Sequence, residues 1–390
     1  MTILANARVV TPREVLDPGW IRFDEGRIDA TGAGDPPRAS GPARDLAGGY
    51  VLPGFVDLHM HGGAGAQVTT DDPDEILRAI DFHRCHGTTR TLASLVTSPV
   101  EQMAAAARTV AQIMRSGDAL GESIAGVHLE GPFLNPRYRG AHHTDFVLPP
   151  DLKALRHLLD AAAGTVRVVT LAPELEGAMD LVRELAAAGV TASVGHTDAT
   201  YEQARHAFDE GARTATHLFN AMRPFQHRDP GPAAAALTHD AVVCELINDG
   251  VHLHDGSIVL ALKAAGADRI AFVTDATSAT GMRDGRFGLG PMTILARAGK
   301  VTLLDGTTNA GSTLTMDRAV RHAVTCVGVS ILDAAKAAAA TPARVLGLQD
   351  RTGSIVAGKD ADLVVLSDTL HVRAVVARGR LVHGGYDQPT

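Results

Sequence analysis

PGFVDLHMH, residues 53–61, is an apolar run that leaves a Pro-Gly turn and ends on two histidines. A short run of this kind, bounded by Pro and Gly, predicts a β-strand. Side chains two positions apart on a strand point the same way, so His59 and His61 share one face. Imidazole is the commonest protein ligand of zinc or iron, and the pair predicts a divalent metal site at a strand end. Alone, the same pattern also fits two histidines at the start of a loop.

Four later apolar runs also end on a residue that can bind a metal ion or move a proton. In chain order these residues are Glu130, His196, His217 and Asp275. Each motif alone has an ordinary explanation, such as an acid that caps a turn. Together with the first run they favour one shared metal-binding rim. Such a set is typical of metal-assisted hydrolysis, in which the ion activates a water molecule and the Asp handles the proton.

The apolar runs alternate with helical stretches rich in Ala and Leu, which is the pattern of βαβ units. Roughly eight such units in roughly 290 residues predict an α/β fold, a (β/α)8 TIM-type barrel, because a barrel gathers its strand ends in one ring. An open doubly wound sheet fits less well. We therefore expect residues 51–349 to form a metal-dependent catalytic barrel domain.

The two ends of the chain differ from this middle section. Residues 1–50 contain short strand-like runs, two of them joined by the turn Asp24-Glu25-Gly26, and residues 350–390 have the same texture. A few strands without a partner face are not stable alone. The two ends are therefore predicted to pair into one small β domain.

Composition excludes several classes of partner. The chain has 390 residues and a net charge of −8, with no run of Lys and Arg, which argues against nucleic acid. The N-terminal stretch MTILANARVV is too short and too polar for a membrane span or a signal peptide, so we expect no membrane partner and a cytoplasmic location. A small anionic substrate is still compatible with the negative net charge, since one or two arginines suffice to bind one phosphate.

Eight ordered stretches carry a resemblance to known enzymes. They are PGFVDLHMHG, GVHLEGPFLN, RGAHH, VGHTDA, THLFNAMRPFQHRDPG, NDGVHLH, VTDATSATG and AGSTLTMD. The chain resembles the amidohydrolase superfamily and, within it, the N-acetylglucosamine-6-phosphate deacetylases. The resemblance implies a small β-sandwich built from both termini beside the barrel, and a homodimer. It also implies hydrolysis of N-acetyl-D-glucosamine 6-phosphate to D-glucosamine 6-phosphate and acetate, in amino-sugar catabolism or cell-wall sugar recycling.

The resemblance assigns roles to the rim residues. Glu130, His196 and His217 match the principal metal ligands. His59 and His61 match a second metal position that some members lose, and their presence favours a two-metal site with Glu130 bridging. We expect one or two divalent ions per subunit, zinc first and Fe, Mn or Co as alternatives. Asp275 matches the catalytic acid/base, which takes a proton from the attacking water and passes it to the departing amine.

The resemblance also implies a substrate site. His142 and His252 match residues that contact the sugar and help to polarise the acetamide carbonyl. The other expected sugar contacts are Ala141, Asn220, Ala221, Asn309, Ala310 and Gly311. Arg228, beside His227, matches a phosphate-binding arginine that reaches the active site of the partner subunit, where a guanidinium grips phosphate with two hydrogen bonds.

Four residues depart from the commoner family pattern, and these differences bear on the range of substrates more than on the type of reaction. They are Arg139, where a lysine is usual, Asn309, where a leucine is usual, Arg223 and Gln226.

Three other classes of function compete with this interpretation. One of them, an anion-binding module without catalysis, gives no reason for the five strand ends that carry metal-binding residues. A D-aminoacylase or cyclic-amide hydrolase typically bridges its metals with a carboxylated lysine, but no lysine follows a predicted barrel strand at the right place and Glu130 occupies an early bridging position. A non-catalytic scaffold relative would have lost Asp275 or the rim histidines, and all of them are present.

Overall fold

The computed structural model describes residues 1–37 and 42–386. The chain forms two compact units. The first contains Met1–Asp57, His83–Arg90 and Thr315–Thr390, and the second contains Leu58–Phe82 and Thr91–Leu314.

An eight-stranded parallel sheet forms the barrel, and its strands are hydrogen-bonded in the order β15-β14-β13-β12-β11-β10-β9-β6. The bounds are β6 Phe55–Asp57, β9 Thr88–Val96, β10 Ile124–Glu130, β11 Val166–Leu171, β12 Thr191–Val194, β13 Thr214–Ala215, β14 Val243–Ile247 and β15 Ile270–Val273. A parallel bridge between Met60 and Ala276 joins the segments that follow the first and last strands. The predicted TIM-type barrel is therefore confirmed.

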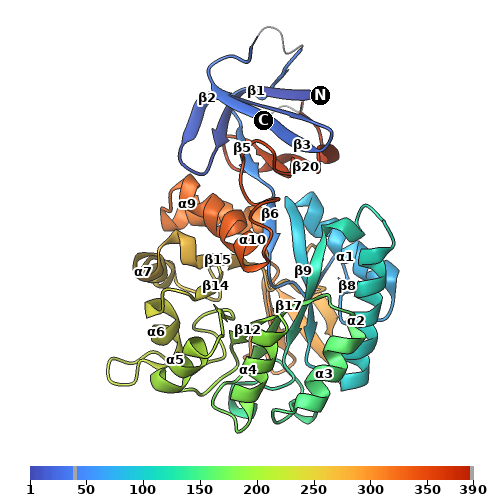
Figure 1. Cartoon of the computed structure of the whole chain (residues 1–390), viewed down its shortest axis with the longest axis vertical. Coiled ribbons are helices and arrows are strands. Elements are labelled where there is room, and N and C mark those ends of the chain that lie inside the picture. Colours follow the sequence, from blue (N-terminus) through green and yellow to red (C-terminus); the bar gives the residue numbers. More distant parts are fainter. Residues whose placement is uncertain (38–41, 387–390) are drawn as a thin grey trace. The chain divides into compact units, whose positions relative to one another are not determined.

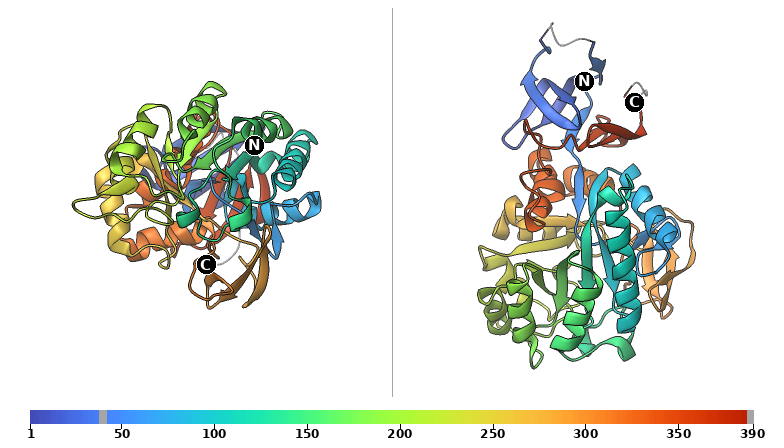
Figure 2. Two further views of the ribbon diagram at one scale, coloured as in Figure 1. Left: turned by 90° about the horizontal axis from the view of Figure 1, so that it is seen from below. Right: turned by 45° about the vertical axis from the view of Figure 1, so that its right-hand side comes forward.

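Helices lie around the outside of the strands and connect one strand to the next (Figure 1, Figure 2). They are α1 Pro73–Cys85, α2 Val100–Arg115, α3 Leu152–Ala161, α4 Ala178–Ala187, α5 Tyr201–Asp209, α6 Gly231–Thr238 and α7 Asp255–Ala265. The helix α2 shows why they pack there, because it buries Met103, Val110 and Ile113 along one stripe. At the start of α5, Thr200 and Gln203 form a capping box that satisfies the free amides.

A small antiparallel sheet within the second unit was not predicted from the sequence. It contains β16 Gly285–Leu289, β17 Met292–Arg297 and β18 Lys300–Leu303, in that order. Its buried face includes Ile294 and Val301, which pack in one cluster with Ala141 and Ala310. The inserted sheet therefore supports two of the segments that were expected to contact the sugar.

The terminal strands form a second large sheet, in the order β21-β20-β19-β5-β1-β2-β3, with β4 paired to β1. Its strands are β1 Thr2–Val10, β2 Val15–Asp24, β3 Arg27–Ala33, β4 Arg44–Asp45, β5 Tyr50–Pro53, β19 Leu363–Leu366, β20 Val372–Ala377 and β21 Arg380–Gly384. Strand β5 pairs with β1 on one side and with β19 on the other. This confirms that the two ends of the chain build one β domain, although residues 38–41 and 387–390 of the predicted domain lie outside the described residues.

The first unit also contains the short helices α8 Met316–His322, α9 Ile331–Ala335 and α10 Thr341–Val345. Arg90 is buried in this unit, within 3.4 Å of an oxygen of Asp360 and 3.1 Å of an oxygen of Asp362. Across residues 1–37 and 42–386, no helix combines the length and the apolar character needed to span a bilayer.

Candidate metal and active site

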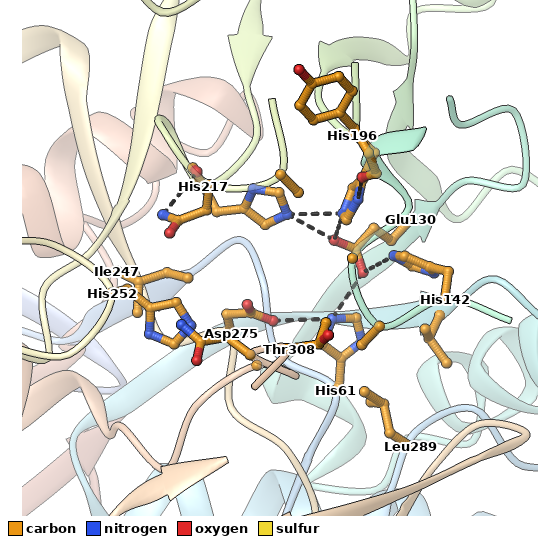
Figure 3. Close-up of a pocket in the computed structure, with 18 of the residues that line it drawn as sticks. His61, Glu130, His142, His196, His217, Ile247, His252, Asp275, Leu289 and Thr308 are labelled. Carbon is orange, nitrogen blue, oxygen red and sulfur yellow. Dashed lines mark hydrogen bonds and ion pairs between the residues drawn. The ribbon is translucent and has the colours of Figure 1, made fainter. Parts of the chain in front are cut away.

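A cavity of about 370 Å³ opens among the residues that follow the barrel strands. Figure 3 shows His61, Glu130, His196, His217 and Asp275 converging on one point of this cavity. The side chains come from five different strand ends, as the sequence predicted. Parallel strands in a barrel end on the same rim, which explains why residues so far apart in the chain meet.

Three of these residues have an unusual backbone conformation. His196, His217 and Asp275 come shortly after β12, β13 and β15, with φ angles of 49°, 30° and 48°. Positive φ is uncommon for residues other than glycine and is concentrated at functional sites, where the surrounding structure holds the strain. Asp275 is held in this way, because its N–H donates to His59 O at 2.8 Å and its carbonyl accepts from Ser312 N at 2.7 Å.

Glu130 lies at the centre of the cluster. Its Oε1 is 3.1 Å from His196 Nε2, 3.2 Å from His217 Nε2 and 3.3 Å from His59 Nε2. Its Oε2 is 3.2 Å from His61 Nε2. Burial raises the pKa of Glu130, but the histidines around it lower this pKa well below its ordinary value. The carboxylate is therefore ionised and faces both pairs of histidines.

The hydrogen bonds on the outer side of the rings decide which nitrogens can bind a metal ion. The Nδ1 of His61 lies 2.8 Å from Ser94 O, and a carbonyl only accepts, so Nδ1 carries the proton. The Nδ1 of His59 faces the Glu245 carboxylate at 3.2 Å. In their neutral forms both rings then present a bare Nε2, and these two nitrogens are 3.0 Å apart. Burial lowers the pKa of both rings, but the carboxylates of Glu130 and Asp275 outweigh this and raise the pKa of His59 well above its ordinary value and that of His61 to about 9. The site therefore attracts positive charge to these two nitrogens, and a divalent ion bound there would take the place of the protons.

The same argument about outward hydrogen bonds applies to the second pair of histidines, His196 and His217. The Nδ1 of His196 lies 2.8 Å from Tyr138 O, so its Nε2 is also bare, 3.0 Å from His217 Nε2. Burial lowers the pKa of His196 to about 4, and the neighbouring His142 adds to this effect. A neutral imidazole is the form that binds metal.

His142 has the opposite tautomer. Its Nδ1 accepts the backbone N–H of Thr97 at 3.3 Å, so the proton is on Nε2, which lies 3.3 Å from Glu130 Oε2. His142 is close enough to join Glu130 and His196 in a metal-binding group, as His59 and His61 join Asp275. In this tautomer the Nε2 of His142 is a donor that faces Glu130, so it has no lone pair to offer a metal ion.

Asp275 and His252 lie on the same side of the cavity (Figure 3). Asp275 Oδ1 is 3.2 Å from His61 Nε2. Burial alone would raise the pKa of Asp275, but the rings of His59 and His61 lower it to about 2, so the group is ionised at neutral pH. His252 Nδ1 lies 2.8 Å from Asp249 Oδ2; burial lowers the pKa of His252, but the hydrogen bond and the charge of Asp249 outweigh this and raise it.

Most of the predicted substrate residues line the cavity. Those that do are Ala141, His142, Asn220, Ala221, His252, Asn309 and Gly311. Ala310 is fully buried behind them. Arg228 is not among the described residues that line the cavity of its own chain. Its reach into a partner subunit stays a prediction.

The two arginines that depart from the family pattern have structural contacts here. Arg139 donates to His142 O at 2.6 Å, and Arg223 pairs with the carboxylates of Asp198 and Asp229 at 3.1 and 2.9 Å. Both guanidinium groups therefore hold loops near the cavity. Asn309, by contrast, lines the cavity itself.

Sequence reasoning missed several residues at this site, among them Arg137, Tyr138 and Glu245. Arg137 and Tyr138 line the cavity, in a loop whose sequence carries no metal-binding or catalytic pattern. Glu245 contacts His59 from within strand β14. A signal for Glu245 was present, because it is the one charged residue in the apolar run 242–247.

Comparison with known proteins defines the class. Residues 50–382 match the model of the amidohydrolase family. The chain therefore belongs to the amidohydrolase family.

The most informative relatives within that family are deacetylases of phosphorylated amino sugars. The chain is 35% identical to N-acetylglucosamine-6-phosphate deacetylase of Bacillus subtilis, over 97% of this chain and 96% of that protein. It is 37% identical to N-acetylgalactosamine-6-phosphate deacetylase of Escherichia coli O157:H7, over 97% and 98%. Among solved structures, a mutant N-acetyl-D-glucosamine-6-phosphate deacetylase of Mycobacterium smegmatis, in complex with N-acetyl-D-glucosamine-6-phosphate, is 42% identical with a TM-score of 0.93, covering 98% of this chain and 99% of that one.

Proposed function

We propose that the protein hydrolyses the acetamide of N-acetyl-D-glucosamine 6-phosphate and releases acetate and D-glucosamine 6-phosphate. The observation that carries this proposal is the convergence of two histidine pairs and two carboxylates at one cavity in a chain so similar to these deacetylases.

We propose that the metal ligands are Glu130, His196 and His217 at one position and His59 and His61 at a second, with Glu130 between them. The Nε2 atoms of His61 and His196, which face Glu130 while their Nδ1 atoms donate outward, and the ionised Glu130 support this assignment. When bound, a divalent ion lowers the pKa of a water molecule and polarises a carbonyl oxygen. We favour zinc, at one or two positions per subunit, because nitrogen and carboxylate ligands suit it; iron, manganese and cobalt remain alternatives.

Asp275 is proposed as the acid/base. Its pKa of about 2 makes it a carboxylate at neutral pH, able to accept a proton from the attacking water. The same proton then returns to the amine nitrogen as the carbon–nitrogen bond breaks. An amine is a poor leaving group without that proton, which explains the need for a carboxyl group at this position.

The two histidines of the cavity wall are proposed to bind the substrate. The Nε2–H of His142 lies at the cavity wall, 3.3 Å from Glu130 Oε2, and would donate to an oxygen of the acetamide or the sugar once Glu130 binds the metal ion. His252 is oriented by Asp249, which keeps a proton on its Nδ1. Donors fixed in advance stabilise a developing oxyanion better than mobile ones.

We propose that the phosphate is bound by Arg228 from a partner subunit, and hence that the protein is a homodimer. We also propose a cytoplasmic location and a division of the chain into a terminal β domain, residues 1–50 and 350–390, and a catalytic domain, residues 51–349. The expected effect of Arg228→Met is a loss of preference for the phosphorylated sugar with kcat nearly unchanged.

The test is acetate release from N-acetylglucosamine 6-phosphate by purified protein loaded with Zn²⁺, run beside the unphosphorylated sugar. We expect strong preference for the phosphorylated sugar and a loss of about 10²–10⁴-fold in kcat in Asp275→Asn. The matched control is Asp240→Asn, at an exposed aspartate far from the cavity lining. Absence of acetate release from the metal-loaded wild type would overturn the proposal.

N-acetylgalactosamine 6-phosphate is the second candidate substrate. The Escherichia coli relative named for this sugar is as similar to the chain as the N-acetylglucosamine-6-phosphate deacetylases are. The two sugars differ only in the orientation of one hydroxyl group. A higher kcat/KM for the galactose epimer would make it the preferred substrate.

A further inference from the structure

Glu245 is a charged residue in a place that ordinarily excludes charge. It lies in the middle of strand β14, its side chain is fully buried, and its neighbours Val243, Cys244, Leu246 and Ile247 are buried and apolar. Removing a carboxylate from water costs several kcal/mol unless partners compensate. The partners of this carboxylate therefore indicate what it does.

Both hydrogen-bond partners of Glu245 Oε2 belong to residues proposed as metal ligands. Glu245 Oε2 lies 3.2 Å from His59 Nδ1 and accepts the backbone N–H of His217 at 3.3 Å. The backbone carbonyl of Glu245 also accepts the N–H of Leu218 at 2.8 Å. One residue of β14 thus holds the ring of one ligand and the backbone of another.

The contact with His59 differs in kind from those of the other ligand rings. The Nδ1 atoms of His61 and His196 donate to main-chain carbonyls, those of Ser94 and Tyr138. His59 instead faces an anionic side chain. An acceptor oxygen held behind an imidazole fixes the tautomer and the orientation of the ring, and an uncharged amide oxygen at the same distance can do the same.

We infer that Glu245 is the positioning residue of the metal centre: it holds a proton of His59 on Nδ1 and so directs Nε2 at the ion, and through the backbone of His217 it connects the two ligand groups. This inference rests on the metal-dependent function proposed above. Glu245 does not line the cavity, so it acts through these two residues and not on the substrate.

Zn²⁺ affinity, measured without substrate by competition with a chromogenic chelator, tests this inference. Glu245→Gln keeps an oxygen that reaches His59, and we expect its affinity to stay within a few-fold of the wild type. Glu245→Asp keeps the charge but is one methylene too short, and Glu245→Met has the length without the acceptor. We expect both to bind the more weakly held ion about 10–100-fold less tightly.

The matched control is Ser193→Ala, which removes a buried 2.6 Å contact with Thr216 Oγ1 in the same barrel interior without touching a proposed ligand. Its Zn²⁺ affinity should equal that of the wild type. If Glu245→Met does not fold, the Zn²⁺ affinities of Glu245→Gln and Glu245→Asp alone test the inference. The inference would be overturned if Glu245→Asp bound Zn²⁺ with wild-type affinity, or if Glu245→Gln and Glu245→Asp lost Zn²⁺ affinity equally.

This readout is independent of the substrate. If the wild type binds Zn²⁺ but releases no acetate, the proposed deacetylase activity fails while the role of Glu245 is still decided by the affinities. Conversely, if the wild type releases acetate and Glu245→Asp and Glu245→Met bind Zn²⁺ as tightly as the wild type, the role of Glu245 is refuted while the deacetylase activity stands.

Discussion

Gly311 leaves room for Asp275, the proposed acid/base, and replacing Gly311 with alanine should damage both stability and activity. Gly311 lines the cavity and has a φ of +65°. A Cβ atom at this position would lie 2.6 Å from Thr277 Cγ2 and 2.7 Å from the carbonyl oxygen of Asp275. It would also lie 3.4 Å from Asp275 Oδ1.

The size of the effect follows from these distances. Left-handed backbone costs a residue with a Cβ atom about 1–2 kcal/mol, and overpacking adds about 1–3 kcal/mol. To reach an ordinary contact of 3.4 Å, the Cβ and the Asp275 carbonyl must separate by about 0.7 Å. Since a misplacement of 1 Å costs on the order of 10²-fold in rate, we expect kcat to fall about 10–100-fold.

Gly306→Ala is the matched control, because Gly306 has a similar φ of +74° and nothing within 4 Å of the added Cβ. It should lose about 1–2 kcal/mol of stability and keep its kcat. The assays are thermal unfolding of the metal-loaded protein and steady-state acetate release, with bound metal measured in each variant. Equal unfolding temperatures and equal kcat values for the Gly311 and Gly306 variants would refute the reasoning.

Three further predictions concern charge and metal. Asp249→Asn should destabilise the fold by about 1–3 kcal/mol at about pH 5.5 and by less at about pH 9. The pKa of His252 is raised above 6.5, so the stability that its charged form contributes is fully present below pH 6.5 and is lost as the pH rises through the raised pKa. An equal loss of stability at both pH values would contradict this. Arg90→Met removes the guanidinium 3.1 Å from the buried Asp362, while Asp360 keeps Arg351 at 3.0 Å; it should cost about 3 kcal/mol in denaturant unfolding, where an unchanged midpoint would count against it. Removal of the metal with a chelator should lower the unfolding temperature and Zn²⁺ should restore it, a contribution of about 2.7 kcal/mol at 100 times Kd; no shift would argue against a metal centre.

The sequence by itself determined the barrel and the residues at its rim. Strand runs that alternate with helices predict βαβ units from local periodicity alone, and a ligand that directly follows a strand must lie on the shared rim. His59, His196 and Asp275 could therefore be placed without any knowledge of their neighbours. The pairing of β1 and β19 through β5 was predicted in outline for a similar reason, since strands at each end lacked a partner face.

Only the tertiary structure decided what surrounds those residues. The contact between Glu245 and His59 joins positions 186 apart, and no local pattern specifies such a partner. The tautomer of His142 depends on Thr97 in the same way. Periodicity reports which face of an element is buried, whereas the hydrogen bond that a buried polar atom makes depends on which elements pack beside it, and for that reason the chemistry of each ring could be read only from the folded chain.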